Sequence, residues 1–286
     1  ALPNITGFGS VITNLGKVDN SGFEFSLNTE NLKLNNFIWR SSLAVWSNRN
    51  EIVSLYGKVP VTDASGNTVL TEQDDRANGW FIGKNINTIW DFRILGVWKV
   101  EEAAMARSYG FAPGDFKLDD VNKDGKFTVD DRVFLGQTAP KFNLNLRNEF
   151  TIYKNFDVSF QLYGRFGLLS QFNEAANVDR FYDRAQFYKR PYWTPTNQID
   201  DYARMMSSLG SGIGLNVWRK SSFIRVNNVS FAYTTPKRLT DKLKLQSLKV
   251  YFNIQNALTV SPWEYFDPEN KDFTPSYGTF GINMTL

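Results

Sequence analysis

The amino-acid sequence predicts an all-β fold, namely an antiparallel portion of a transmembrane β-barrel, of about seven to nine strands, with long loops on one side. Three observations predict it. Apolar residues repeat with a period of two in runs of about 10 residues, the other face of each run is charged or amide-rich, and short connections alternate with long ones. Runs of this length suffice for a tilted strand to cross a bilayer. A soluble sheet with one buried face has the same period, so alternation alone leaves that fold open.

Seven segments carry the alternation, and we expect each to form one strand. In chain order they span residues 22–30, 37–47, 142–152, 156–166, 222–233, 247–257 and 277–286. In the third segment, Phe142 and Leu144 alternate with Asn143 and Asn145. The alternation in 222–233 is less regular than in the others.

The two faces of these strands differ in character. One carries Arg, Glu, Asp, Lys and Gln and is expected to face water, while the other is large, apolar and aromatic. Trp and Tyr gather near the strand ends, at Trp39, Trp46, Tyr153, Tyr163, Tyr233 and Tyr251. This pattern is typical of a lipid-facing band with interfacial aromatic girdles, which accounts for an aromatic content of 15%.

Composition excludes several classes of function. Cys and His are absent, which removes disulfides, thiol nucleophiles, Cys zinc sites and the commonest general base. The net charge of +3 is spread along the chain and provides no basic arm for nucleic acid. We therefore expect neither an enzyme nor a nucleic-acid-binding protein.

Connection lengths predict how the strands are oriented. The connections at 31–36, 153–155 and 234–246 are short, and the second makes a tight hairpin turn. Those at 48–87, 100–140 and 167–221 are long. Outer-membrane barrels join short periplasmic turns to longer extracellular loops, so 167–221 is predicted to be a large extracellular loop.

Strand parity predicts an incomplete barrel. Counting back from a periplasmic C-terminus, the stretch 86–100 must contribute no strand or two, which gives a total of seven or nine. Self-contained bacterial barrels have even strand numbers. We therefore expect residues 1–286 to be the C-terminal part of one larger barrel domain, without a plug domain.

Seven stretches, in order along the chain, share motifs with a known family. They are Asn14 to Val18 with Gly22-Phe23-Glu24, Gly83 to Ile86 with Gly96-Val97-Trp98, Pro113 to Asp131-Arg132 with Pro140-Lys141-Phe142, Trp193 to Asn197, Phe223 to Val229 with Tyr233 and Pro236, Asn256 to Thr259, and Asp267-Pro268-Glu269. Together they make the chain resemble the C-terminal β-barrel region of SusC/RagA-like TonB-dependent outer-membrane transporters. The family usually ends in an aromatic residue, whereas this chain ends in Leu286.

The resemblance implies a role and partners. It implies a wall segment of an about 22-stranded barrel in the outer membrane of a Gram-negative bacterium, embedded among outer-membrane lipid and lipopolysaccharide. It implies nutrient uptake of oligosaccharides or peptides with a SusD-like surface lipoprotein, powered by the TonB complex through an N-terminal region outside this sequence. The alternating Phe280, Ile282, Met284 and Leu286 would be the assembly signal. Two alternatives remain: a structural docking barrel in a larger outer-membrane complex, and a soluble calcium-stabilised β-sheet binding domain.

One loop, within 100–140, carries a motif for metal chemistry. Its candidate oxygen ligands have the spacing of a 12-residue calcium loop: Asp120, Asn122, Asp124, the carbonyl of Lys126, Thr128 and Asp131. Gly125 occupies the position that requires a sharp turn. The motif predicts a structural Ca²⁺, and the alternative is a polar loop stabilised by Asx turns.

The largest loop contains candidate contacts for a ligand. Tyr188, Tyr192 and Trp193 lie in a stretch rich in aromatic and guanidinium groups, where a sugar, a peptide or a lid protein could stack. The alternative is that these residues order the loop by packing and ion pairs.

Overall fold

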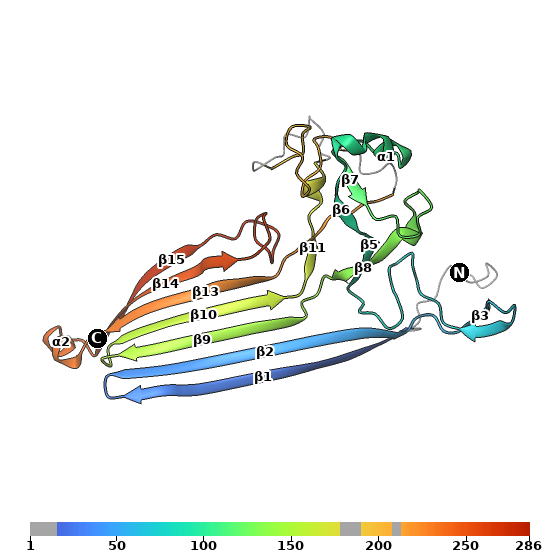
Figure 1. The fold of residues 1–286 in the computed structure, drawn as a ribbon. Helices are drawn as coiled ribbons and strands as arrows, with labels where there is room; N and C mark the ends of the chain where they lie inside the picture. Colours follow the sequence, from blue (N-terminus) through green and yellow to red (C-terminus); the bar gives the residue numbers. More distant parts are fainter. Residues whose placement is uncertain (1–15, 178–189, 208–212) are drawn as a thin grey trace, which may run out of the picture. The chain divides into compact units, whose positions relative to one another are not determined.

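The computed structural model describes residues 16–177, 190–207 and 213–286. Their main element is a seven-stranded sheet in the order β1-β2-β9-β10-β13-β14-β15 (Figure 1). Its strands are β1 (Lys17–Leu34), β2 (Phe37–Ser54), β9 (Phe142–Ile152), β10 (Phe156–Phe166), β13 (Phe223–Thr234), β14 (Ser247–Val260) and β15 (Tyr277–Thr285). The pairings from β2 through β15 are antiparallel, which confirms the predicted fold class.

The connections contain small two-stranded sheets and short helices. The pairs are β3 (Val59–Thr62) with β4 (Thr68–Thr71), β5 (Thr88–Phe92) with β8 (Arg132–Gln137), β6 (Ile94–Val97) with β7 (Phe116–Leu118), and β11 (Leu169–Gln171) with β12 (Trp218–Lys220). The helices are α1 (Ala103–Ser108) and α2 (Lys237–Lys242), with 3₁₀ turns at Val100–Glu102, Val129–Asp131 and Asn173–Ala176.

The chain divides into two compact units. One holds residues Asn48–Thr88 and the start of the chain up to Gly22, and the other holds Phe23–Ser47 and Ile89–Leu286. In the first unit, the N–H groups of Ile52 and Gly83 bond to the carbonyls of Lys84 and Ile52, which fixes residues 83–84 beside β2. The second unit contains the rest of the sheet and the sites described below.

The structure decides between the two strand counts. Residues 88–97 form β5 and β6, which pair with β8 and β7 and not with the main sheet. They add no strand to the main sheet, so the described part of the chain contributes seven strands to that sheet. Strands β1 and β2 are longer than predicted, with 18 residues each. The added residues 17–21 at the start of β1 are mostly polar and continue the strand without hydrophobic alternation.

A β-bulge in β13 explains its irregular pattern. Val226 pairs with Leu162 of β10, but Asn228 pairs with the adjacent Gln161, so Asn227 is the extra residue. An extra residue shifts every later side chain to the opposite face. The apolar face therefore uses Ile224 and Val226 before the bulge, but Val229, Phe231 and Tyr233 after it.

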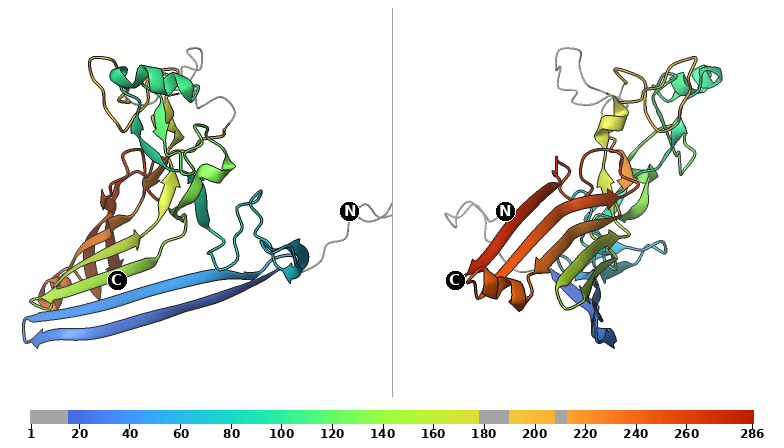
Figure 2. Two further views of the ribbon diagram at one scale, coloured as in Figure 1. Left: turned by 45° about the vertical axis from the view of Figure 1, so that its right-hand side comes forward. Right: turned by 90° about the vertical axis from the view of Figure 1, so that its left-hand side faces the viewer.

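The ends of the sheet differ as predicted. We call the end with turns 35–36 and 153–155, the α2 connection 235–246 and the C-terminus the turn end (Figures 1 and 2). The connections 167–222 and 261–276 leave from the opposite end, the loop end. Tyr153 and Lys154 have φ of 50° and 65°, the left-handed values that a tight hairpin turn requires.

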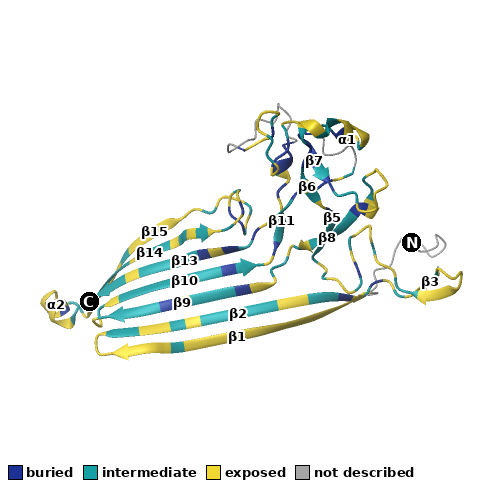
Figure 3. Ribbon diagram, in the orientation of Figure 1, coloured by how far each residue is buried: buried dark blue, intermediate teal, exposed yellow. Residues whose placement is uncertain are grey.

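Burial in this protein is concentrated in the connections. The main core cluster contains Phe92, Trp98, Phe116, Phe172, Trp193, Tyr202 and Trp263, all outside the seven-stranded sheet. In contrast, Figure 3 shows β1 and β15 mostly exposed and the strands between them mostly at intermediate burial. Phe23 and Phe280 are 59% and 66% exposed. A soluble sheet covers its apolar face, so this exposure favours contact with lipid.

No helix in residues 16–177, 190–207 or 213–286 combines the length and hydrophobicity required to cross a membrane.

Candidate functional site

The polar face of the sheet carries interactions both along a strand and between neighbouring strands. The Arg147 guanidinium lies 2.6 Å from the Glu149 carboxylate, and Gln161 donates a 2.9 Å hydrogen bond to Asn145 on β9. Beside them is a depression of about 130 Å³, lined by Arg147 and by Ser159, Gln161, Asn228, Ser230 and Asn253. Hydroxyl and amide groups at this density suit a surface that contacts water and polar solutes.

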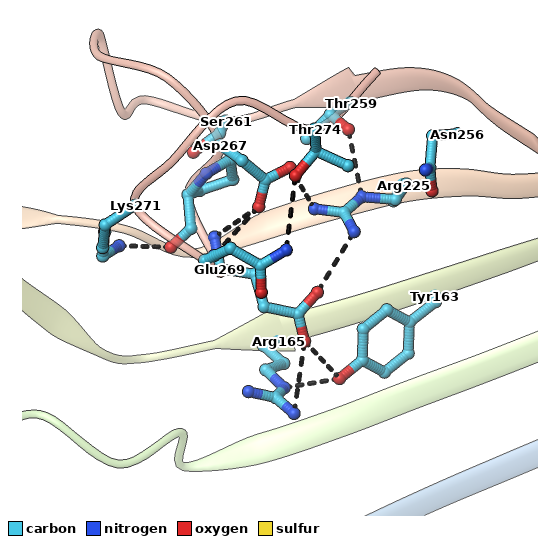
Figure 4. Close-up of polar contacts among 12 residues, drawn as sticks. Tyr163, Arg165, Arg225, Asn256, Thr259, Ser261, Asp267, Glu269, Lys271 and Thr274 are labelled. Carbon is cyan, nitrogen blue, oxygen red and sulfur yellow. Dashed lines mark hydrogen bonds and ion pairs between the residues drawn. The ribbon is translucent and has the colours of Figure 1, made fainter. Parts of the chain in front are cut away.

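At the loop end of this face, an ion-pair network holds the connection 261–276 against the sheet (Figure 4). Arg225 of β13 lies 2.5 Å from the Asp267 carboxylate and 3.1 Å from that of Glu269. Its Nε donates a 3.2 Å hydrogen bond to Thr259 of β14. The side chains of Arg225 and Asp267 are each only 6% exposed.

The network also reaches β10. Glu269 accepts a 3.3 Å hydrogen bond from the Tyr163 hydroxyl and lies 3.3 Å from the Arg165 guanidinium. Two strands, β10 and β13, therefore hold one loop through a single acidic pair. Arg225, Asp267 and Glu269 lie within the family motifs, but the sequence alone predicted no role for them. The only signals in the sequence were an arginine that is the single charged residue of its strand and the acidic loop motif.

Asp267 also organises the backbone of its own loop. Its Oδ1 accepts N–H groups from Glu269 at 2.8 Å and Asn270 at 3.1 Å. Burial acts to raise the pKa of Asp267, but these N–H groups and Arg225 outweigh it, and the pKa lies below its usual 3.8. The loop is thus built around an ionised carboxylate.

This lowered pKa predicts that acid releases the loop. A carboxylate with a depressed pKa in the folded protein contributes stability that is complete above its unfolded value of 3.8 and is lost as pH falls through the lower folded value. We expect hydrogen exchange in residues 261–276 to increase below about pH 4. Asp267→Asn should remove this pH step from the loop. A step of unchanged size in that variant would contradict the assignment.

The same loop reaches the core cluster through Trp263. The Trp263 ring is buried, and its centroid lies 5.3 Å from that of Phe172. The Lys271 ammonium lies 4.0 Å from the Trp263 centroid and donates to the Pro268 carbonyl. Burial lowers the pKa of Lys271 to about 8, against the opposing charge of Asp267. Connection 261–276 therefore links the polar face to the core of the loops.

A pocket of about 440 Å³ lies among the loop-end connections. Asp200, Asp201, Arg219 and Lys220 supply charges of both signs to its lining, and Trp218 supplies an aromatic ring. Arg219 lies over the rings of Phe172 and Tyr202, at 5.2 and 5.0 Å from their centroids. The Trp218 indole N–H donates to the buried Asp91. Such a lining could take a polar or zwitterionic ligand.

Its neighbour Tyr202 belongs to the core and stays protonated. The hydroxyl donates a 2.6 Å hydrogen bond to Glu264. Burial, followed by this acceptor, raises the pKa of Tyr202 well above its usual value. Tyr202 therefore acts as a fixed hydrogen-bond donor beside the pocket.

The predicted aromatic contacts lie in different environments. Tyr188 lies outside the described residues. Tyr192 is 47% exposed, whereas Trp193 is only 5% exposed and belongs to the core cluster. The packing alternative therefore fits Trp193, and ligand or lid contact by Tyr192 stays a prediction. The proposed assembly signal lies along β15, where Phe280, Ile282 and Met284 are exposed, and its role also stays a prediction.

The calcium-type loop has part of the arrangement that the motif predicts. Asp120 Oδ2 accepts the Gly125 N–H at 3.0 Å and the Tyr109 hydroxyl at 2.8 Å. Asp120 Oδ1 is buried without a hydrogen-bond partner. Asn122 and Asp124 accept backbone N–H groups two residues ahead, which are Asx turns. The first half of the loop is thus shaped by side-chain oxygens that accept its own backbone N–H groups.

In the second half of the loop, the carboxylate oxygens of Asp131 already accept hydrogen bonds from backbone N–H groups. Asp131 is fully buried, and its two oxygens accept N–H groups from Val121 at 3.0 Å and Thr128 at 2.8 Å. In the described ranges, no three carboxylate, His or Cys side chains gather closely enough to hold a metal ion. Asp120, Asn122 and Asp124 remain the candidate Ca²⁺ ligands, and Asp131 could join them only by sharing oxygens that already accept backbone N–H groups. Calcium binding therefore stays a prediction.

Comparison with known proteins gives a consistent set of relatives. No family model matches the chain. It is 32% identical over 286 residues to TonB-dependent receptor P26 of Formosa agariphila, covering 95% of this chain and 28% of the receptor. It is 24% identical over 276 residues to TonB-dependent receptor SusC of Bacteroides thetaiotaomicron, covering 94% of this chain and 26% of SusC.

Solved structures show the same fold. The RagAB peptide importer in the open-open state matches with a TM-score of 0.69 at 18% identity, covering all of this chain and 30% of that one. The RagAB peptide transporter matches with a TM-score of 0.68 at 18% identity, again over the whole chain and 31% of the other. The chain thus spans less than a third of the length of these relatives.

Proposed function

Because this chain is a SusC/RagA-like TonB-dependent transporter region, we propose that it forms part of the wall and surface loops of an outer-membrane nutrient importer. The observation that carries the proposal is the contrast between the two faces of one sheet. The apolar face is open to the surroundings, and the opposite face carries charges and a loop held by Arg225. A wall between lipid and an aqueous lumen requires this contrast.

In this proposal, the turn end is periplasmic and the loop end is extracellular. The protein would lie in the outer membrane of a Gram-negative bacterium as a multi-pass barrel. The whole transporter would take up oligosaccharides or peptides with a SusD-like lipoprotein as its lid, and TonB would act through the N-terminal region. The chain would contribute no catalysis. The mixed pocket beside Trp218 and the exposed Tyr192 are the parts of the chain that support ligand or lid contact.

Uptake by cells tests this function. Deleting the gene for the full-length protein should abolish growth on the imported oligosaccharide or peptide, and the intact gene should restore it. Unchanged uptake together with loss of an outer-membrane complex would favour the docking alternative. A monodisperse full-length protein in water without detergent would instead support the soluble alternative and contradict both barrel functions.

We also propose that the loop 120–131 binds one structural Ca²⁺. The turn at Gly125 and the unpartnered Asp120 Oδ1 support this. We expect the variant Asp120→Ala/Asp124→Ala to lose one bound Ca²⁺ per full-length molecule, measured by elemental analysis after dialysis. Proteolysis between residues 114 and 136 should then increase. Lys123→Ala, which changes an exposed side chain outside the ligand set, is the control. Equal calcium content in all three proteins would contradict the proposal.

A further inference from the structure

The α2 connection at the turn end carries a cluster of unpaired positive charge. Lys237, Arg238, Lys242 and Lys244 are all exposed. In the described part of the chain, none of the four is paired with a carboxylate. The only acidic residue in 235–246 is Asp241, so the connection carries a net charge of +3 from four cations and one anion.

The same connection also presents apolar side chains. Leu239 and Leu243 are 47% and 58% exposed, while Thr240 is fully buried. The Thr235 N–H bonds to the Leu248 carbonyl of β14, and the Gln246 N–H bonds to the Thr285 carbonyl of β15. A short anchored segment with exposed leucines and lysines is typical of chain that lies at a membrane surface.

Next to this connection, the apolar face of the sheet is hollowed. The groove holds about 270 Å³ and runs over β10, β13, β14 and β15. Its lining includes Phe156, Val158, Phe231, Tyr233, Phe252 and Phe280. Cross-strand register places them on one face, since Phe156 pairs with Tyr233, Phe231 with Phe252, and Phe252 with Phe280. Tyr233 lies three residues before Pro236, which precedes α2, so groove and cations are adjacent.

We propose that this groove and the α2 connection form a binding site for an anionic phospholipid of the periplasmic leaflet. The acyl chain would lie in the aromatic groove, and the phosphate would face the four cations. Charge complementarity selects this occupant, because an apolar groove alone would accept any acyl chain, whereas an adjacent cluster of unpaired cations favours a negative headgroup. The inference rests on the proposed function, because the groove faces lipid only if the sheet is a membrane wall.

Lipid titration of the full-length protein in detergent, read by native mass spectrometry, tests the site. We expect phosphatidylglycerol to bind more tightly than phosphatidylcholine. Lys237→Gln/Arg238→Gln should weaken phosphatidylglycerol binding roughly fivefold per cation, about 25-fold for the pair. Lys58→Gln/Arg107→Gln removes the same charges from exposed residues of other connections and should change nothing. Phe231→Ala/Phe252→Ala should weaken the binding of both lipids.

The outcomes separate this inference from the proposed function. Equal affinity for the two lipids, or an equal loss of phosphatidylglycerol affinity in both charge variants, contradicts the lipid site. Neither result affects the proposal that the sheet is a membrane wall. Loss of a periplasmic protein partner in Lys237→Gln/Arg238→Gln, with unchanged lipid binding, also overturns it. A full-length protein that folds in water without detergent would contradict the proposed function, in which the sheet is a membrane wall. An unchanged melting temperature identifies the variants that are correctly folded.

Discussion

Replacing Arg225 with Ala is expected to release connection 261–276 from the sheet and to destabilise the folded protein by about 3–5 kcal/mol. The side chain is 6% exposed and pairs with both Asp267 and Glu269. Removing it leaves the buried Asp267 carboxylate without its cation, while Glu269 keeps Arg165 as its cationic partner. The cost of an uncompensated buried charge exceeds the value of an ordinary surface ion pair.

Hydrogen exchange of the full-length protein, followed in residues 261–276, measures this effect locally. Arg165→Ala is the matched control, because Arg165 also pairs with Glu269 but is 39% exposed. It should cost no more than about 1 kcal/mol. Arg225→Lys should fall between the two, since an ammonium keeps the charge but loses the paired geometry of the guanidinium. Equal protection of the loop in all variants would show that packing, and not Arg225, holds it.

The Arg225 network illustrates the difference between features of this fold that the sequence predicts and features that it does not. Alternation along single strands predicted the antiparallel sheet and its two faces, because these depend on local periodicity. The network depends on connection 261–276 returning to the polar face, which no local pattern specifies. Phe223 is a second example. It is apolar but faces the polar side beside Arg165, where it is 2% exposed.

Strand ends and loop aromatics illustrate a different limit. The mostly polar start of β1, residues 17–21, belongs to the strand because the backbone pairing with β2 begins before the alternating segment does. Trp193 was a candidate platform for a ligand because exposed and buried aromatics have the same sequence signal. Its burial depends on a glycine nearly 80 residues earlier, Gly114, whose missing side chain leaves room for the ring.

Gly114→Ala is therefore expected to disrupt the core of the loops. A Cβ at this position would lie 2.6 Å from Cε3 of Trp193 and 2.7 Å from Cβ of Arg204. Gly114 also has a φ of 90°, which L side chains rarely adopt. Arg204 cannot move freely, because its Nε donates a 2.9 Å hydrogen bond to Asp115, which is fully buried. Overpacking and backbone strain together should cost about 2–5 kcal/mol.

A second glycine separates the two causes of this cost. Gly110 has a φ of 80°, but a Cβ added there would meet no atom within 4 Å, so Gly110→Ala should show the backbone term alone, about 1 kcal/mol. Limited proteolysis of the full-length protein, with fluorescence from Trp193 and its buried neighbours, would report the state of the loop core. If the two variants were equally stable, the contact between Gly114 and Trp193 would not hold the core together. If Gly114→Ala alone exposed the loops to protease while the sheet stayed folded, the loop core would be a unit whose stability is separate from that of the sheet.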